Sequence, residues 1–119
     1  MDLSIITVTW NSGDLIEKQI RSVKVGCKNV SFEQIIVDNA STDNTAEVIQ
    51  NNFSEVTFLK NTTNSGFAAA NNQAAKLAQG EFLLFLNPDM RVEEGSLDKM
   101  VEWMRSQPKA GVASCKLLD

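Results

Sequence analysis

The sequence predicts an α/β fold, in which a parallel sheet is covered by helices on both faces. Short apolar segments alternate along the chain with segments whose apolar residues recur at helical spacing, which is typical of such folds. The segment Phe82–Leu86 is apolar at consecutive positions, as expected of a central strand that is buried on both sides. This strand must end before Pro88, which has no N–H for the sheet ladder. It therefore presents Asp89 at its carboxyl end, where open α/β sheets bind ligands.

The first strand and helix are expected within residues 3–26. Leu3–Trp10 has the composition of a buried strand, and the next segment, Asn11–Asp14, combines turn-forming and helix-capping residues. Gly26 is a candidate helix stop signal. The apolar residues before it form one stripe of an amphipathic helix: Ile16, Ile20 and Val23.

A second strand and helix follow a polar loop. Gln34–Asp38 is a short apolar strand that ends in a carboxylate. The helix is expected to follow Asn44 and to run to about Asn51, because Asn44 and Glu47 have the spacing of a capping box, with Asn in place of the usual Ser or Thr.

The second half of the chain continues the alternation. Val56–Leu59 is a third strand, and the loop Asn61–Gly66 leads into a helix over residues 67–77 that Gly80 caps. The remaining expected elements are the strand Phe82–Leu86, a helix over residues 97–104 that Pro108 closes, and a fifth strand at Gly111–Cys115.

Composition limits the function classes. The 119 residues suffice for one domain, and 43% apolar and 22% charged residues are ordinary for a globular protein. A net charge of −4, without any cluster of Lys or Arg longer than a pair, argues against a nucleic-acid surface. The absence of histidine removes Ser-His and Cys-His catalysis and the usual zinc sites. Cys27 and Cys115 are expected to be buried free thiols in a reducing cytoplasm.

Polar residues follow four successive strands. In a parallel sheet they meet at one edge, where they would line one crevice, although each loop taken alone could simply form a turn. No G-x-G-x-x-G follows the first strand, no P-loop motif is present, and the acidic pair of a receiver domain is missing. The four groups are Thr9–Asn11, Asp38–Asn39, Asn64–Gly66, and Asn87 with Asp89.

Four motifs resemble the family 2 glycosyltransferases of GT-A fold, particularly the branch that includes rhamnosyl- and galactofuranosyl-transferases. They occur in the family's order over essentially the whole chain: Ile5–Asn11, Ile35–Asp43, Asn64–Asn72 and Phe82–Asp89. The resemblance implies a Rossmann-like GT-A sheet. It also implies that residues 1–119 form a single nucleotide-diphosphate-sugar-binding domain, cut before the acceptor-binding half.

The resemblance implies roles for residues at the first two strand ends. Val8, Thr9 and Trp10 would line the nucleoside pocket, and the indole would either stack on a base or pack in the core. Asp38 would accept a hydrogen bond from the ring N–H of uracil or thymine.

Similar roles are implied for the last two strand ends. Asn64, Gly66 and Asn71 belong to the segment that covers the nucleotide, where relatives carry more glycine than this chain has. Asn87 would contact ribose or sugar, and Asp89 would be the main protein ligand of Mg²⁺ or Mn²⁺.

The implied reaction is an inverting transfer of a hexosyl or deoxyhexosyl group from a UDP- or dTDP-sugar to a glycan or a lipid-linked saccharide. The family's carboxylate base would lie beyond Asp119, so the chain alone is expected to be inactive, and Asp119 itself is a poorly held terminal residue. The enzyme is expected in the cytoplasm, also as a peripheral protein at the inner face of the membrane.

Two alternatives remain. A non-catalytic module would bind nucleotide or a partner protein and would self-associate through an unfinished sheet edge. A nucleotidyltransferase would need a basic, glycine-rich loop after the first strand, which Asn11–Leu15 does not supply.

Overall fold

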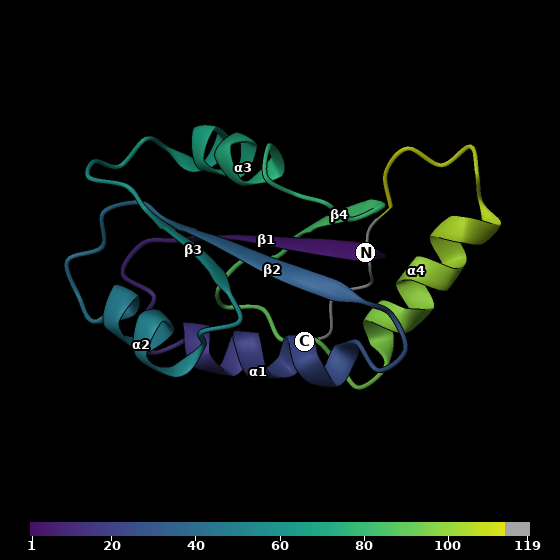
Figure 1. Ribbon diagram of the computed structural model, residues 1–119, viewed down its shortest axis with the longest axis horizontal. Coiled ribbons are helices and arrows are strands. Elements are labelled where there is room, and N and C mark those ends of the chain that lie inside the picture. The colour runs from purple at the N-terminus through teal and green to yellow at the C-terminus, as the bar shows by residue number, and fades with distance from the viewer. Residues whose placement is uncertain (114–119) are drawn as a thin grey trace.

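The computed structural model describes residues 1–113 and contains a parallel four-stranded sheet with helices on both faces (Figure 1). The predicted α/β class is therefore confirmed. In chain order the elements are β1 (Leu3–Thr9), α1 (Ile16–Gly26), β2 (Phe32–Asp38), α2 (Thr45–Asn52), β3 (Thr57–Lys60), α3 (Phe67–Ala75), β4 (Phe82–Phe85) and α4 (Ser96–Ser106).

The strand order β3-β2-β1-β4 puts the carboxyl ends of all four strands at one edge of the sheet. Thr9 of β1 lies opposite Asp38 of β2, and Asp38 lies opposite Lys60 of β3. On the other side of β1, Ile6 lies opposite Phe85 of β4. Because every pairing is parallel, the loops that follow the four strands project in the same direction.

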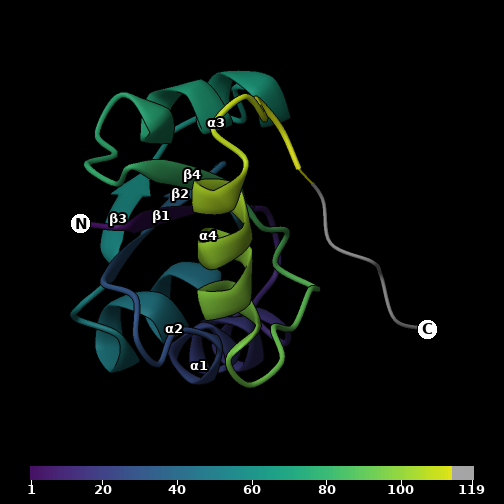
Figure 2. The same cartoon turned by 90° about the vertical axis from the view of Figure 1, so that its right-hand side faces the viewer.

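Helices cover the two faces unequally. Within residues 1–113, α3 is the one helix that packs on one face, α1 and α2 lie on the other, and α4 stands beside the amino ends of the strands, next to the end of α1 (Figures 1 and 2). The small side chains Ala70 and Ala74 let α3 pack closely on β1 and β2, where the buried residues of that face are Ile6, Val8, Ile35 and Val37. On the opposite face α1 contributes the predicted apolar stripe of Ile16, Ile20 and Val23.

Strand β4 is an edge strand within residues 1–113, so the prediction that Phe82–Leu86 is a central strand is wrong for this part of the chain. Leu83 and Phe85 are 45% and 52% exposed, because α3 packs over β1 and β2 and leaves this face of β4 uncovered. Consecutive apolar residues indicate burial on both faces, but they do not say which segment provides it. The predicted strand end is confirmed, since the last ladder bond runs from the N–H of Leu86 to the carbonyl of Ile6.

Helix ends follow different chemistry from that predicted. Helix α2 begins after Asn44, as expected, but the Asn44 side chain makes no capping bond. Instead, the carboxylate of Asp43 accepts a hydrogen bond from the N–H of Thr45 at 3.0 Å. Helix α1 begins after Leu15, whose side chain cannot cap, so the polar segment before it serves as a turn.

The prediction that Gly80 caps the third helix is wrong, because α3 already ends at Ala75. The N–H of Gly80 donates instead to the hydroxyl of Ser4 at 2.8 Å. A Cβ at Gly80 would lie 2.5 Å from the backbone nitrogen of Ser4. This position therefore requires glycine because two backbone segments approach each other closely.

Two expectations depend partly on the end of the chain. The predicted fifth strand is absent at Gly111–Ala113, and its other residues, Ser114 and Cys115, lie outside the described residues.

Cys27 is a buried free thiol, as predicted, and desolvation together with the charge of Asp98 raises its pKa to about 12. No helix within residues 1–113 is long and apolar enough to cross a membrane.

Candidate functional site

A cleft of about 410 Å³ opens at the carboxyl edge of the sheet. Residues from all four strand-end loops contribute to it, which confirms that these loops converge on one crevice. Its lining residues are Val8, Trp10, Ser12, Asn39, Asn64, Phe67, Asn87, Pro88 and Asp89.

The cleft contains only part of the predicted site. The predicted residues that line it are Val8, Trp10, Asn64, Asn87 and Asp89. Those that do not are Thr9, Asp38, Gly66 and Asn71, which build or flank the loops around it.

Asp38 is completely buried, and its carboxylate faces neighbouring loops rather than the cleft. One oxygen, Oδ1, accepts from the hydroxyls of Thr9 at 2.7 Å and Ser41 at 2.6 Å. The other, Oδ2, accepts from the N–H of Ser41 at 2.9 Å. These bonds close a tight turn after β2, and a nucleobase could reach the carboxylate only if Ser41 or Thr9 moved. The assignment of Asp38 to base recognition therefore stays a prediction.

The turn after β2 is tied to the end of β1. Asn11 adopts a left-handed φ of 48°, and its side-chain oxygen accepts from the N–H of Thr42 at 2.8 Å. Its own N–H donates to the hydroxyl of Ser41 at 2.8 Å. Asp43 adds a further bond, from the N–H of Gly13 at 3.1 Å. Burial raises the pKa of Asp43, but hydrogen bonds from Thr45 and Gly13 outweigh it and hold the pKa below its ordinary value.

Asn39 connects β2 to the loop before α3, a role that the sequence reasoning missed. This side chain is 2% exposed, and its oxygen accepts from Asn61 Nδ2 and from the hydroxyl of Ser65, both at 3.1 Å. Its amide nitrogen donates to the carbonyl of Gly66 at 3.1 Å. The only sequence signal was its place beside Asp38 at a strand end.

The start of α3 faces the cleft through Asn64 and Phe67. Gly66 precedes the helix with a φ of 88°, a conformation that favours glycine, and its N–H donates to Asn64 Oδ1 at 2.9 Å. No atom beyond its chain neighbours would lie within 4 Å of a Cβ at this position, so a ligand can approach the backbone closely. The unpaired N–H groups in the first turn of α3 favour an anion here.

Two exposed aromatic side chains line the cleft. Trp10 is 58% exposed and Phe67 is 57% exposed, so neither packs in the core. For Trp10 this removes the alternative of a core aromatic. Flat apolar surfaces of this kind are available for stacking on a planar ligand.

Asn87 and Asp89 lie on an exposed turn directly after β4. The turn is closed by a hydrogen bond of 3.1 Å from the N–H of Met90 to the carbonyl of Asn87. Within residues 1–113 there is no group of three or more His, Cys, Asp and Glu side chains that could enclose a metal ion. A carboxylate in an open cleft suits a hard cation only if water or ligand oxygens complete its coordination, which is how Mg²⁺ commonly binds beside phosphates.

The sequence model described as Glycosyl transferase family 2 matches residues 4–116, nearly the whole chain. The chain belongs to this family. It is 36% identical over 107 residues to the teichuronic acid biosynthesis glycosyltransferase TuaG of Bacillus subtilis. Over 119 residues it is 35% identical to the O-antigen biosynthesis protein RfbC of Myxococcus xanthus. These alignments cover 86% and 98% of the chain, respectively.

Solved GT-A glycosyltransferases share the fold. The structure of Staphylococcus aureus TarS in complex with UDP superposes with a TM-score of 0.78 at 29% identity and covers 89% of this chain. A mannosyltransferase of Pyrobaculum calidifontis in complex with GDP-Man and Mn²⁺ gives a TM-score of 0.76 at 25% identity, over 86% of this chain.

This glycosyl transferase family 2 chain spans only part of its relatives. It covers 41% of TuaG, 9% of RfbC and 32% of the TarS chain solved with UDP. The matched part in TarS belongs to a protein that binds UDP and, in another structure, UDP-GlcNAc. The rhamnosyl- and galactofuranosyl-transferase branch is not among these relatives.

Proposed function

We propose that this family 2 chain is the donor-binding half of an inverting glycosyltransferase, with the nucleoside diphosphate in the cleft at the carboxyl edge of the sheet. The observation that carries the proposal is the joint contribution of four strand-end loops to this one cleft. It brings exposed aromatic rings, a helix N-terminus and Asp89 together, which matches the base, diphosphate and metal of a nucleotide sugar.

The proposed donor is a UDP- or dTDP-sugar that carries a hexosyl or deoxyhexosyl group. The UDP and UDP-GlcNAc complexes of TarS support a uracil base. The GDP-Man complex of the mannosyltransferase makes guanine the alternative to test. Trp10 and Phe67 would contact the base or ribose, since both rings are exposed in the cleft. Membership of the rhamnosyl- and galactofuranosyl-transferase branch is part of this proposal.

Asp89 would hold Mg²⁺ or Mn²⁺ together with diphosphate oxygens and water. The site fits such an ion, because one exposed carboxylate is a hard ligand that leaves room for phosphate oxygens and water. The Mn²⁺ in the mannosyltransferase complex supports this choice. When bound, the metal would neutralise negative charge on the departing nucleoside diphosphate.

The residues of this chain would bind and orient the leaving group. The first turn of α3 would attract the diphosphate, and Asn87 would contact the ribose or the sugar. The base that removes the proton from the acceptor hydroxyl is proposed to come from outside these residues. The proposed acceptor is a glycan or a lipid-linked saccharide at the cytoplasmic face of the membrane. A role in cell-wall or polysaccharide biosynthesis is supported by the names of TuaG and RfbC, which assign those two proteins to teichuronic acid and O-antigen biosynthesis.

A partner-binding module is the second candidate, and a specific observation favours it. Leu83 and Phe85 are exposed on the α3 side of β4, which is also an open edge within the described chain. Apolar sheet surface of this kind favours association with another protein or a second copy. Light scattering during nucleotide titration separates this module, which would associate without binding nucleotide, from the donor-binding half.

Calorimetric titration with UDP, dTDP and GDP tests the proposed function. UDP or dTDP is expected to bind about tenfold more tightly with Mn²⁺ than without it, which corresponds to about 1.4 kcal/mol. In Asp89→Asn this metal-dependent gain should disappear, whereas the control Glu47→Gln, an exposed residue on α2, should keep it. Identical binding with and without Mn²⁺ would contradict the proposed metal site, and absence of any nucleotide binding would contradict the function.

A further inference from the structure

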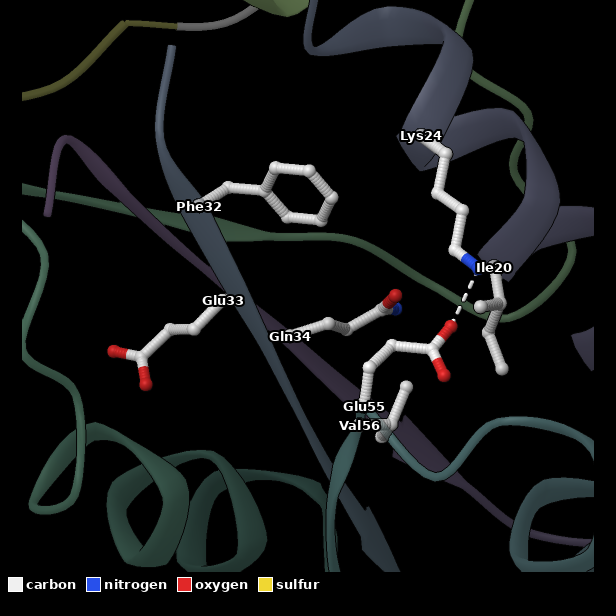
Figure 3. A pocket seen from close by; sticks show the side chains of 7 residues that line it. All are labelled: Ile20, Lys24, Phe32, Glu33, Gln34, Glu55 and Val56. Carbon is white, nitrogen blue, oxygen red and sulfur yellow. Dashed lines mark ion pairs between the residues drawn. The ribbon is translucent and has the colours of Figure 1, made fainter.

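Two glutamine side chains are buried between the sheet and α1. Gln19 of α1 is 0% exposed, and Gln34 of β2 is 4% exposed. Figure 3 shows Gln34 extending from β2 toward Ile20 of α1, at a pocket of about 180 Å³ on the side of the sheet that α1 covers. Buried amides are costly unless all their polar atoms are paired, so their contacts indicate why they are there.

The amide nitrogen of Gln19 reaches the turn that carries Asn87 and Asp89. It donates to the hydroxyl of Thr7 at 2.8 Å and lies 3.4 Å from the carbonyl oxygens of both Leu86 and Asn87. The carbonyl of Asn87 also accepts the N–H of Met90, the bond that closes the turn. Gln19 therefore contacts the two backbone carbonyls at the start of this turn.

The orientation of both amides follows from these carbonyls. Carbonyl oxygens only accept hydrogen bonds, so Gln19 must present its amino group to them and its oxygen to Gln34. The amino group of Gln34 donates to Gln19 Oε1 at 2.9 Å and to the hydroxyl of Thr7 at 3.3 Å. Gln34 Oε1 is thereby left without a partner, and it is the one buried side-chain oxygen or nitrogen within residues 1–113 in that condition.

We propose that Gln19, oriented by Gln34, is a positioning residue that holds the Asn87–Asp89 turn in place for the metal and the diphosphate. Apolar side chains of similar size at Thr7, Gln19 and Gln34 could fill this space without any unpaired side-chain oxygen, so stability alone does not account for the polar cluster. What the pair adds is a donor at the carbonyls of Leu86 and Asn87. The effect on the metal and the diphosphate rests on the proposed function, but the effect on the turn does not.

The test replaces both amides at once. Both amides also donate to the buried hydroxyl of Thr7, so the double replacements are made in a Thr7→Val background. In that background Gln19→Met/Gln34→Met leaves no side-chain polar atom of the cluster unpaired, and it should be at least as stable as Thr7→Val alone, which should keep the turn ordered. The control Gln34→Met keeps the donor of Gln19 but strands its oxygen, so it should be less stable and still hold the turn. A positioning role therefore predicts that the double replacement loses order in the turn without losing stability, whereas Gln34→Met loses stability without losing order in the turn. A second pair, Gln19→Leu/Gln34→Leu, guards against a poor fit of methionine.

The first measurement is the NMR order parameter of the Asn87 and Asp89 amides without ligand. The double variants should fall from about 0.85 to below about 0.6, whereas Gln34→Met should match the wild type. The second measurement is the gain in UDP affinity with Mn²⁺, which should shrink several-fold in the double variants only. Unchanged order parameters in a stable double variant would overturn the inference. If the wild type binds no nucleotide, the proposed function fails, and the order parameters still decide whether Gln19 holds the turn.

Discussion

At the scale of single residues, Ala40 is the most strained position near the cleft. Its φ of 63° lies in the left-handed region, which a residue with a Cβ adopts only at a cost of roughly 1–2 kcal/mol. Hydrogen bonds on either side of Ala40 keep it in this conformation. Ser41 donates to the carboxylate of Asp38, and the loop before α3 donates to the side chain of Asn39. The strained residue thus directly follows Asn39, which lines the cleft at the end of β2.

We expect Ala40→Gly to stabilise the protein by about 0.5 kcal/mol. Glycine relieves the left-handed strain, but part of the gain is lost to the greater entropy of the unfolded chain. Urea unfolding measures the change. The control Ala46→Gly, in the first turn of α2, should instead destabilise by up to about 1 kcal/mol. A loss of stability in Ala40→Gly would show that this turn is not strained.

The sequence allowed some site residues to be predicted and not others. Asp89 was predictable, because Pro88 must end the strand and leave the next carboxylate at its carboxyl end. Asn39 was not, because an asparagine after a strand is just as typical of a simple turn. Its bonds to Asn61 and Ser65 depend on a loop that is remote in sequence.

At the scale of elements, Asp98 joins α4 to the connection between α1 and β2. Its carboxylate accepts hydrogen bonds of 2.9–3.0 Å from the backbone N–H groups of Lys28, Asn29 and Val30. Burial raises the pKa of Asp98, but these N–H groups outweigh it and lower the pKa below 3.8. The folded protein therefore stabilises the ionised form of Asp98 more than the unfolded chain does.

This bond network predicts a stability change in acid. The contribution of ionised Asp98 to the free energy of unfolding should be complete at neutral pH. It should be lost as the pH falls from about 3.8 through the lower pKa of the folded state. Asp98→Asn should lose about 1 kcal/mol at pH 7 and should show a smaller further loss between pH 5 and pH 3. Urea midpoints across this range measure both effects.

The control for this prediction is Glu102→Gln, on the exposed side of the same helix. It should keep the acid dependence of the wild type. Parallel pH profiles for Asp98→Asn and the wild type would show that another group controls acid stability.

Among the elements, periodicity predicted the helices and strands better than their surroundings. The stripe of Ile16, Ile20 and Val23 is buried as expected, because helical spacing directly defines a face. The apolar run of β4 indicated two buried faces, yet Leu83 and Phe85 lie uncovered within residues 1–113. Local sequence does not specify which distant segment packs on a strand.

At the scale of the whole molecule, parallel topology explains why the cleft could be predicted. Once strands alternate with helices, every strand-end loop must reach the same edge of the sheet. Trp10, Asn64 and Asp89 therefore meet in one cleft, although they are distant in sequence. The conformations that turn Asp38 inward and Asn39 toward the cleft depend on individual hydrogen bonds, which composition and spacing do not determine.

The central claim is that a nucleoside diphosphate and its metal bind at the carboxyl edge, beside Asp89. The most direct measurement is the paramagnetic broadening of backbone NMR signals when Mn²⁺ is added to the protein with UDP. Signals from four residues should broaden first, and Asp89→Asn should abolish the effect. These residues are Asn64, Gly66, Asn87 and Asp89. Broadening centred instead on the pocket beside Lys24 and Glu55, or none with UDP present, would contradict it.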